Sequence, residues 1–597
     1  MKGEVKSMGY TYHRNEAIIH SKTREFFGIG AVVTASTYLV LVVDFMLIGR
    51  ILGADAVTAA GLCDSFVDVA EFPGFVMSSA GAIAAALLLG KRKFRQANGV
   101  FTLSFLITIA GGLLCWCLLP FCGLFSSILT NNSTISGDVE RYMFFTIAAS
   151  PFVGINLVLS SFAIMDNHSR LAMGNVVASN VVNVVLDIVF MKFLHMGVAG
   201  AAAASLLGNV VGILVGLPYF FSKRRTFRFA LPAGDLREAY RELMKSSSSF
   251  AADKASRVVS SLIVNMLLMY FVGNIGVALY AVYGRLKFIL RLLAGGALQT
   301  ISNLGSLLYG ERDFFGLRKM MFLLFRYTYT MVAVIIGALF FFSAPYLRSY
   351  GIDPATPADT LLAFRIMLFS LPFLWLNDLL TRFYPSIQRQ ELSVILLALQ
   401  NVVFKILILL TGVAVIVKCN LSSLTVVAVW CFLVEFLSPA VTLLWEQWKY
   451  GNVAILGRKE KDQTEPDCHT FSITGRPENV ADIHREIDNF CQQNGISRNK
   501  GNLLAIAFEE AVLNVINHNG HVDMIDICLL LEDGNLIVRI RDNGAPFDPL
   551  GFVDEEDILQ MNNIKLLEKL TDQKTYTRIM NMNNTVLSIR LEAAENA

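Results

Sequence analysis

The chain has 597 residues, of which 54% are hydrophobic and only 16% are charged. Soluble domains carry about 25% charged residues, so this composition excludes an ordinary soluble protein and indicates a membrane protein. The charge is also uneven, because residues 1–456 carry 36 Lys and Arg against 24 Asp and Glu, whereas residues 457–597 carry 14 against 24. We therefore expect a basic, apolar membrane domain followed by an acidic soluble domain.

Twelve apolar stretches are each long enough for a helix to cross about 30 Å of hydrocarbon, which takes roughly 20 residues. They are centred near residues 37, 74, 111, 153, 182, 208, 260, 291, 332, 372, 404 and 433. The loops after even-numbered stretches are basic, as at residues 91–93 and 223–225. Because Lys and Arg concentrate in cytoplasmic loops, we expect a multi-pass protein of the plasma membrane with both termini in the cytoplasm.

The membrane part repeats itself at an offset of about 220 residues. Gly90 aligns with Gly310 at that offset, and Asn180 aligns with Asn401 at an offset of 221. Two six-helix halves with the same orientation are typical of transporters, which hold the substrate between the halves. We therefore predict an all-α polytopic membrane domain with two six-helix repeats. The predicted N-terminal segment, first lobe, second lobe, linker and C-terminal domain are residues 1–24, 25–232, 233–449, 450–470 and 471–597.

Ionisable side chains inside apolar stretches are costly, so each is a candidate functional residue. Asp44 lies in the first stretch. Asn183 and Asp187 lie four residues apart in the fifth stretch, and this spacing puts them on one helix face. Such a group can offer oxygen ligands to a hard cation, or its crowded carboxylates can hold a proton. Alternatively, these side chains only satisfy one another in a static core.

Residues 25–450 resemble the MATE (multidrug and toxic compound extrusion) transporters. The resemblance is carried by residues 43–53, 183–187 and 200–205. In members whose cation site is known, an Asp of helix 1, an Asn and an Asp of helix 5 and a Thr of helix 6 converge. The corresponding residues here are Asp44, Asn183, Asp187 and Ser205, with Ser in place of Thr. The resemblance implies an antiporter that exports an organic, drug-like or amphiphilic substrate against H+ or Na+, with Asp44 and Asp187 as the metal ligands if the ion is Na+.

The second half lacks this set, because Asn183 aligns with Phe404 and Asp187 with Ile408. Other charges allow two interpretations: a polar cavity for an amphiphilic or zwitterionic substrate, or ion pairs between the lobes. The residues concerned are an acidic stripe and a set of basic residues: Asp64, Asp68 and Glu71, and Lys254, Arg257, Arg285, Lys287 and Arg291. Asp378 and Glu435 are candidates for a second proton site.

Beyond a charged linker, the pattern becomes that of a soluble domain. Amphipathic helices are predicted over residues 480–493 and 503–518, and strands over residues 525–531, 536–540 and 586–591. A hairpin joins the first two strands. We therefore predict an α+β sandwich with helices on one face of a sheet.

This tail resembles the GHKL ATPase superfamily, most closely the anti-sigma-factor serine kinases. Glu510 and Asn514 match its ExxxN box, Asp542 and Gly544 match its DxG box, and Thr585 matches a Thr on the adenine side. In that family the Glu is the catalytic base, the Asn ligates the Mg2+ of ATP, and the Asp binds the adenine amino group. The resemblance therefore implies that the tail binds ATP and Mg2+.

One departure bears on catalysis. The glycine-rich segment that cradles the phosphates in GHKL proteins corresponds to residues 560–567, which contain no glycine. Phosphoryl transfer depends on positioning the phosphates, so we expect weak ATPase or Ser/Thr kinase activity at most.

Three functions remain open. The first is a secondary exporter with a cytoplasmic nucleotide-binding regulatory domain. The second is a membrane-anchored signalling protein whose tail is an anti-sigma-type serine kinase acting on a cytoplasmic regulatory protein. The third is a lipid-linked sugar flippase of the same fold superfamily. We expect the lipid bilayer and a small organic molecule as partners, and no nucleic acid.

Overall fold

The computed structural model describes residues 16–129, 133–166, 168–222, 225–230, 236–271, 274–349, 359–419, 423–456, 468–477, 480–518, 522–532, 534–549, 569, 571–580 and 582–590. The chain divides into two compact units. The larger unit is formed by residues 23–457, and the smaller by residues 1–22 and 458–597.

The first half of the larger unit is helical. Its helices are α1 (Glu16–Leu52), α2 (Ala54–Leu62), α3 (Asp64–Gly90), α4 (Phe94–Trp116), α5 (Cys122–Leu129), α6 (Ser133–Met165), α7 (Ser169–Ile188), α8 (Val198–Gly216) and α9 (Pro218–Phe221). A π-helical turn, η2 (Val189–Phe193), continues α7, and a 3-10 turn, η1 (Leu119–Phe121), precedes α5.

The second half repeats this design. Its helices are α10 (Leu236–Phe271), α11 (Asn274–Thr300), α12 (Ser306–Gly310), α13 (Phe314–Phe341), α14 (Ser343–Ser349), α15 (Thr360–Leu368), α16 (Leu371–Ser386), α17 (Gln390–Ala398), α18 (Phe404–Cys419) and α19 (Ser423–Tyr450). π-Helical turns η3 (Ile301–Gly305) and η4 (Leu399–Val403) join α11 to α12 and α17 to α18, and a 3-10 turn, η5 (Ala454–Leu456), follows α19.

Within the described residues, ten helical stretches are long and apolar enough to cross a membrane. They coincide with ten of the twelve predicted spans. The other two predicted positions are occupied by the long helices α10 and α11, whose charged residues, among them Lys254 and Arg291, make them less apolar. The chain is therefore a multi-pass membrane protein, and the count of twelve is reached only when these two charged helices are included.

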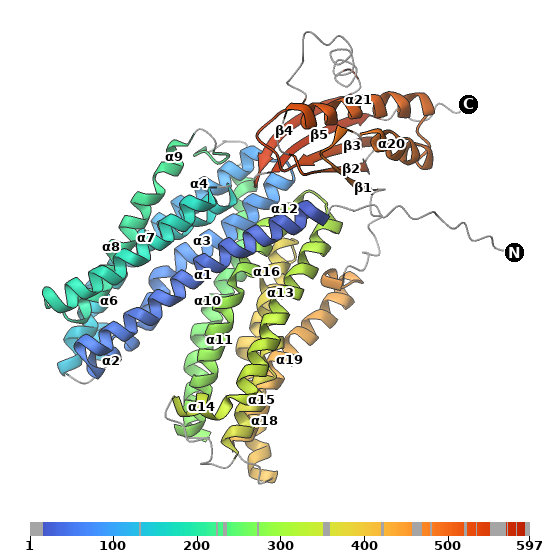
Figure 1. Ribbon diagram of the computed structural model, residues 1–597. Coiled ribbons are helices and arrows are strands. Elements are labelled where there is room, and N and C mark those ends of the chain that lie inside the picture. Colours follow the sequence, from blue (N-terminus) through green and yellow to red (C-terminus); the bar gives the residue numbers. More distant parts are fainter. Residues whose placement is uncertain are drawn as a thin grey trace. The chain divides into compact units, whose positions relative to one another are not determined.

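Each half packs mainly on itself, and α10 and α12 also pack against α3 (Figure 1). The halves share a local scaffold. Asn180 Nδ2 on α7 donates to Ser36 Oγ on α1 at 2.7 Å. Asn401 Nδ2, at the aligned position of the second half, donates to Ser256 Oγ on α10 at 3.0 Å. Both bonds tie the first helix of a half to its fifth, so the sequence repeat is also a structural repeat.

The smaller unit contains a five-stranded antiparallel sheet in the order β1-β2-β3-β5-β4. Its elements are β1 (Cys468–Thr474), α20 (Ala481–Gln493), α21 (Arg498–His518), β2 (Met524–Glu532), β3 (Asn535–Asp542), β4 (Gln573–Ile579) and β5 (Met582–Arg590). Side chains from both helices, such as Ile483 and Phe508, share one core with alternate strand residues such as Ile527 and Val538. The helices therefore cover one face of the sheet, which confirms the predicted α+β sandwich.

Candidate functional sites

The predicted cation residues come from three helices of the first half. We assign the Asn183 amide with its nitrogen toward Asp44, since the opposite orientation would place its oxygen against a carboxylate. Nδ2 then donates to Asp44 Oδ1 at 3.0 Å and to Oδ2 at 3.3 Å. The amide oxygen accepts from the Ser205 backbone N at 3.0 Å and from Ser205 Oγ at 2.9 Å. Asn183 thereby links α1 to α8.

Asp187 lies one turn further along α7 and is 0% exposed. Its carboxyl is within hydrogen-bonding reach of the Asp44 carboxyl. Apart from that contact, neither oxygen of Asp187 has a hydrogen-bond partner among the described residues. Two adjacent carboxylates in a buried place repel each other unless a proton or a cation lies between them. The four predicted residues therefore meet in an arrangement that can hold either.

A glycine allows the helices to approach closely at this point. A β-carbon on Gly208 of α8 would lie 2.7 Å from the carbonyl oxygen of Ser179 and 3.1 Å from the β-carbon of Asn183, both on α7. Small residues let transmembrane helices pack backbone against backbone. This close approach brings Ser205, one turn before Gly208, within reach of the Asn183 amide.

Further polar groups, which sequence reasoning missed, extend from this site. Asn209 Nδ2 donates to the Ser205 carbonyl oxygen at 2.8 Å, and Asn156 Nδ2 on α6 donates to Asn209 Oδ1 at 3.0 Å. The signal in the sequence is the presence of amides within long apolar stretches. The chain of hydrogen bonds joins the predicted site to α6.

In the second half, the candidate carboxylates already have basic partners. Asp378 accepts two hydrogen bonds from Arg291, each at 2.8 Å. Glu435, which is 2% exposed, accepts from Lys287 Nζ at 2.9 Å. Their pairing favours a structural role over the predicted second proton site.

The acidic stripe of α3 meets a lysine of α10. Lys254 Nζ contacts the Asp68 carboxylate and lies 3.4 Å from Glu71 Oε2. This contact joins the two halves. It agrees with the interpretation that these charges form ion pairs between the lobes. The side chains of Asp64 and Arg285 lie outside the described residues.

The predicted adenine side of the small unit forms a hydrogen-bonded group at the end of β3. Gly544 N donates to Asp542 Oδ1 at 2.9 Å, and Asn583 Nδ2 donates to the same oxygen at 2.8 Å. Burial raises the pKa of the Asp542 carboxyl above its ordinary value, and the hydrogen bond from Asn583 opposes this shift. Thr585 pairs with Ile540 on the neighbouring strand and lies on the same sheet face as Asn583.

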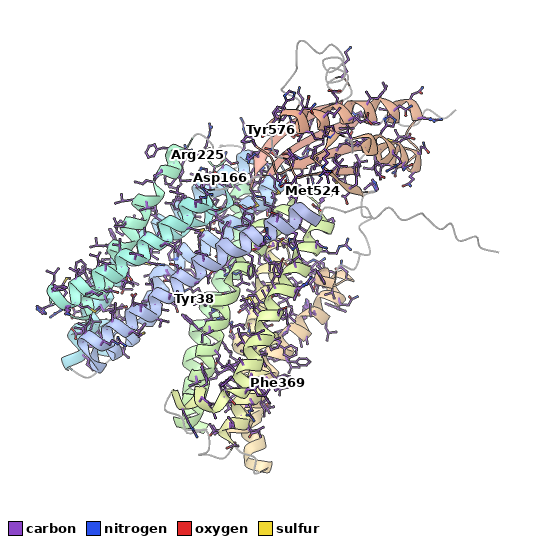
Figure 2. The ribbon with its side chains drawn as sticks, viewed as in Figure 1. Tyr38, Asp166, Arg225, Phe369, Met524 and Tyr576 are labelled. Atoms are coloured by element: carbon purple, nitrogen blue, oxygen red, sulfur yellow. The ribbon has the colours of Figure 1, made fainter. Side chains whose placement is uncertain are left out.

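Sequence reasoning missed the residues that hold Asn583 in place. Tyr576 on β4, labelled in Figure 2, donates from its hydroxyl to Asn583 Oδ1 at 2.9 Å. Arg578 Nη1 donates to the same oxygen at 2.8 Å and to the Gly544 carbonyl oxygen at 2.9 Å. The β4–β5 hairpin thus braces the loop that follows Asp542.

The predicted Mg2+ side lies on α21. Asn514 is 0% exposed, and its Nδ2 donates to the Pro549 carbonyl oxygen at 3.2 Å, in the loop that follows β3. Glu510 lies one turn earlier on the same helix and is partly buried. The segment 560–567, which replaces the glycine-rich phosphate loop, lies outside the described residues.

Two families match the chain. MatE matches residues 31–189 and 252–411, together more than half of the sequence, and the family described as histidine kinase-like ATPase domain matches residues 473–587. The two MatE segments fall in the two halves of the membrane unit.

Among curated proteins, the chain is similar to two proteins named multidrug export protein MepA. The one from Staphylococcus haemolyticus is 26% identical over 215 residues, which are 36% of this chain and 47% of that protein. The one from Staphylococcus saprophyticus is 24% identical over 219 residues, which are 36% and 48%. The chain thus spans about half the length of the curated relatives it matches.

Solved structures show the same fold over nearly the whole membrane unit. A MOP superfamily transporter from Pyrococcus furiosus matches with a TM-score of 0.64 at 18% identity, covering 74% of this chain and 97% of that one. An outward-facing multidrug resistance MATE family transporter matches with a TM-score of 0.63 at 20% identity, covering 72% and 96%.

Proposed function

The chain belongs to the MatE family through residues 31–189 and 252–411, and from this membership we propose that it is a secondary exporter. It exchanges H+ or Na+ for a small organic, drug-like or amphiphilic substrate by alternating access. It acts in the plasma membrane with both termini in the cytoplasm. The MepA proteins it resembles are named multidrug export proteins, which supports an organic substrate.

The observation that carries the proposal is the buried carboxyl of Asp187 facing that of Asp44. An ionisable group fully inside a membrane helix is costly, and it persists where it has a function. Asn183 and Ser205 add an amide and a hydroxyl to the pair. Such a set of oxygens suits a proton or a Na+ ion, and Na+ would be held by Asp44 and Asp187.

Helix α1 gives this site a route to the second half. A β-carbon on Gly30 of α1 would lie 2.8 Å from the Cα atom of Gly296 on α11. Tyr38 of α1, labelled in Figure 2, packs edge-to-face on Phe288 of α11 with ring centroids 4.4 Å apart. Because α1 carries Asp44 and also touches α11, binding of the ion at Asp44 shifts a helix shared by both halves. This contact couples ion binding to the rearrangement that moves substrate.

The small unit serves as a nucleotide-binding regulatory domain. Its residues fit the adenine of ATP, because Asp542 offers a buried acceptor and Gly544 places no side chain beside it. Asn514 would hold Mg2+ through the ATP phosphates, and Glu510 is the candidate base for a slow ATPase or kinase reaction. Bound ATP would supply the charged phosphoryl groups. The chain's own residues would orient the adenine and shield it from water.

The test is dye efflux from proteoliposomes containing the full chain, with ethidium as substrate and imposed H+ or Na+ gradients. Asp44→Asn and Asp187→Asn should each abolish gradient-driven efflux while the protein still inserts and elutes as a folded species. Ser205→Thr should retain efflux, because it keeps the hydroxyl. Ser205→Ala should slow efflux roughly fivefold, as expected for the loss of one hydrogen bond of about 1 kcal/mol. Wild-type rates in Asp44→Asn and Asp187→Asn would refute ion coupling at this site.

A further inference from the structure

The second half contains a cluster of charged side chains whose positive members outnumber the negative ones. The members influence one another electrostatically and come from α10, α11, α16, α18 and α19. The described cations are Arg257, Lys287, Arg291, Arg382 and Lys405, and the described carboxylates are Asp253, Asp378 and Glu435. Five positive groups therefore face three negative ones.

Each carboxylate of the cluster is already engaged by one cation. Asp378 pairs with Arg291, and Glu435 pairs with Lys287. Asp253 accepts from Arg257 Nε at 2.7 Å. Glu435 has little capacity left, because Oε2 also accepts from Gln400 Nε2 at 2.6 Å.

Two cations remain. In the part of the chain that the structure describes, neither Arg382 nor Lys405 has a carboxylate within ion-pair distance. Lys405 Nζ donates to Ser260 Oγ at 3.0 Å and to Asn401 Oδ1 at 3.4 Å, which are neutral acceptors. Arg382 lies over the ring of Phe250, 4.5 Å from its centroid. Buried cations without a directly paired carboxylate are costly, unless an anion joins them.

Arg257 interacts electrostatically with both Arg382 and Lys405. Its side chain is 44% exposed although it pairs with Asp253. The guanidinium can therefore reach a ligand without breaking that pair. Arg guanidinium groups suit carboxylates and phosphates because their donors match two oxygens at once.

The repeat shows how the charge of the two halves differs on one scaffold. Asn401 is bonded to Ser256 as Asn180 is bonded to Ser36. In the first half, one turn beyond Asn180 comes the ion site. In the second half, the residue four positions beyond Asn401 is Lys405, and Ile408 stands where the first half has Asp187. At the offset of 221, Lys405 aligns with Val184, one position after Asn183, so the fifth helix of one half carries the acidic ion site and that of the other half carries a lysine close to the corresponding place.

Apolar rings adjoin the basic groups. Arg382 lies 5.7 Å from the ring centroid of Phe75 on α3, in the first half. Lys287 Nζ lies 4.5 Å from the ring centroid of Tyr283, and Trp430 Nε1 donates to the Lys405 carbonyl oxygen at 3.0 Å. Charge beside aromatic surface suits a ligand with an anionic group and an apolar body.

We propose that Lys405, Arg257 and Arg382 bind an oxyanion group, a carboxylate or a phosphate, of an amphiphilic substrate. The inference rests on the exporter function, for which it names the substrate class. The ion site of the first half takes the coupling cation, and the second half takes the anionic group of those substrates that carry one. A neutral Lys405 that only fills space is the competing explanation.

The test is equilibrium binding to the full chain in phosphatidylcholine nanodiscs, with carboxyfluorescein and naphthyl phosphate as probes. Lys405→Gln and Arg382→Gln should each weaken binding of these anions at least tenfold. Arg326→Gln, which removes an exposed arginine of α13, is the matched control and should leave binding unchanged. Binding of ethidium should not weaken in any of the three variants.

Equal anion affinities in wild type, Lys405→Gln and Arg382→Gln would overturn the proposal, as would the absence of saturable binding of both probes to the wild type. Asp44→Asn separates the two proposals, because it should lose efflux and keep anion binding. If the wild type binds the anions through Lys405 but exports nothing, the exporter proposal fails and the anion site stands. Displacement of the probes by phosphatidylglycerol in the nanodisc would identify a lipid headgroup as the source of the oxyanion.

Discussion

Gly90, the last residue of α3, lies backbone against backbone with Gly310, the last residue of α12, although 220 residues separate them in the sequence. A β-carbon on Gly90 would lie 2.5 Å from the carbonyl oxygen of Leu307, and one on Gly310 would lie 2.5 Å from that of Leu87. The two glycines occupy the same place in the repeat. The halves therefore touch each other through equivalent residues at the end of the unit that carries the basic loops.

This contact predicts that a side chain at either glycine impairs transport. Gly90→Val and Gly310→Val should each reduce gradient-driven ethidium efflux at least tenfold, because the added atoms force the two backbones apart and prevent this closed arrangement. Gly337→Val on α13 is the control, since a β-carbon there meets nothing within 4 Å. Efflux rates in proteoliposomes provide the measurement. Normal rates in both variants would show that closure at this point is not needed.

A buried ion pair at the end of α19 predicts a large effect on stability. Glu446 is 0% exposed and accepts from Arg389 Nη1 at 2.5 Å and from the Tyr384 hydroxyl at 3.2 Å. Glu446→Gln removes the negative charge beside a buried guanidinium, and we expect a loss of about 3–5 kcal/mol. Thermal unfolding in detergent should show a markedly lower midpoint.

The matched control for this experiment is Glu391→Gln. Glu391 pairs with Lys449 at 3.2 Å and accepts from the Tyr450 hydroxyl, but the side chains of Lys449 and Glu391 are 43% and 40% exposed. Exposed pairs contribute about 0–1 kcal/mol, so the midpoint should barely move. Similar shifts in the two variants would show that burial does not decide the strength of these pairs.

The small unit predicts that nucleotide affinity and stability respond oppositely to one substitution. Asp542→Asn should weaken binding of a fluorescent ATP analogue to the full chain at least tenfold, because the proposed nucleotide site uses this carboxylate as the acceptor for the adenine amino group. Asp572→Asn, at an exposed position of the same unit, should leave binding unchanged. Unaltered affinity in Asp542→Asn would mean that the adenine binds elsewhere.

The stability of Asp542→Asn follows from the raised pKa of the Asp542 carboxyl. Because the pKa is higher in the folded than in the unfolded state, the ionised form costs stability at neutral pH. The amide keeps an acceptor oxygen without that cost, so the variant should unfold at an equal or higher temperature than wild type at pH 7. The difference should shrink as the pH falls through the folded pKa, and unfolding midpoints measured across the acid range would show whether it does.

The charge of the loops predicts the orientation in the membrane. Reporters after residue 597 and in the loop at residues 223–228 should be cytoplasmic, because Lys and Arg stay on that side. A tag near residue 132 should be accessible from outside. Labelling with an impermeant reagent in intact cells would measure this, and an external C-terminus would contradict the count of twelve spans.

Much of the fold could be read from the sequence because its causes are local. Apolar stretches of membrane-spanning length dictate helices wherever they occur, since an unpaired backbone is too costly in lipid. The repeat can be recognised in the sequence for the same reason. Arg92 and Arg312, at aligned positions, also share a left-handed backbone conformation, with φ values of 61° and 59°. In the small unit, strands β1 and β4 were not predicted. The polar, largely exposed β4 has no alternating apolar face, because an edge strand buries little.

For the candidate sites, too, some features can be read from the sequence and others depend on the fold. The amino-acid sequence reveals which side chains are costly enough to be functional, because Asp44, Asn183 and Asp187 stand within apolar stretches. The partners of these side chains depend on the fold, since ion pairs and hydrogen bonds join residues that are distant in the chain. The fold pairs Arg291 with Asp378 and leaves Lys405 facing neutral acceptors. Hydrophobic burial is encoded residue by residue, whereas the compensation of a buried charge depends on which helices the fold brings together.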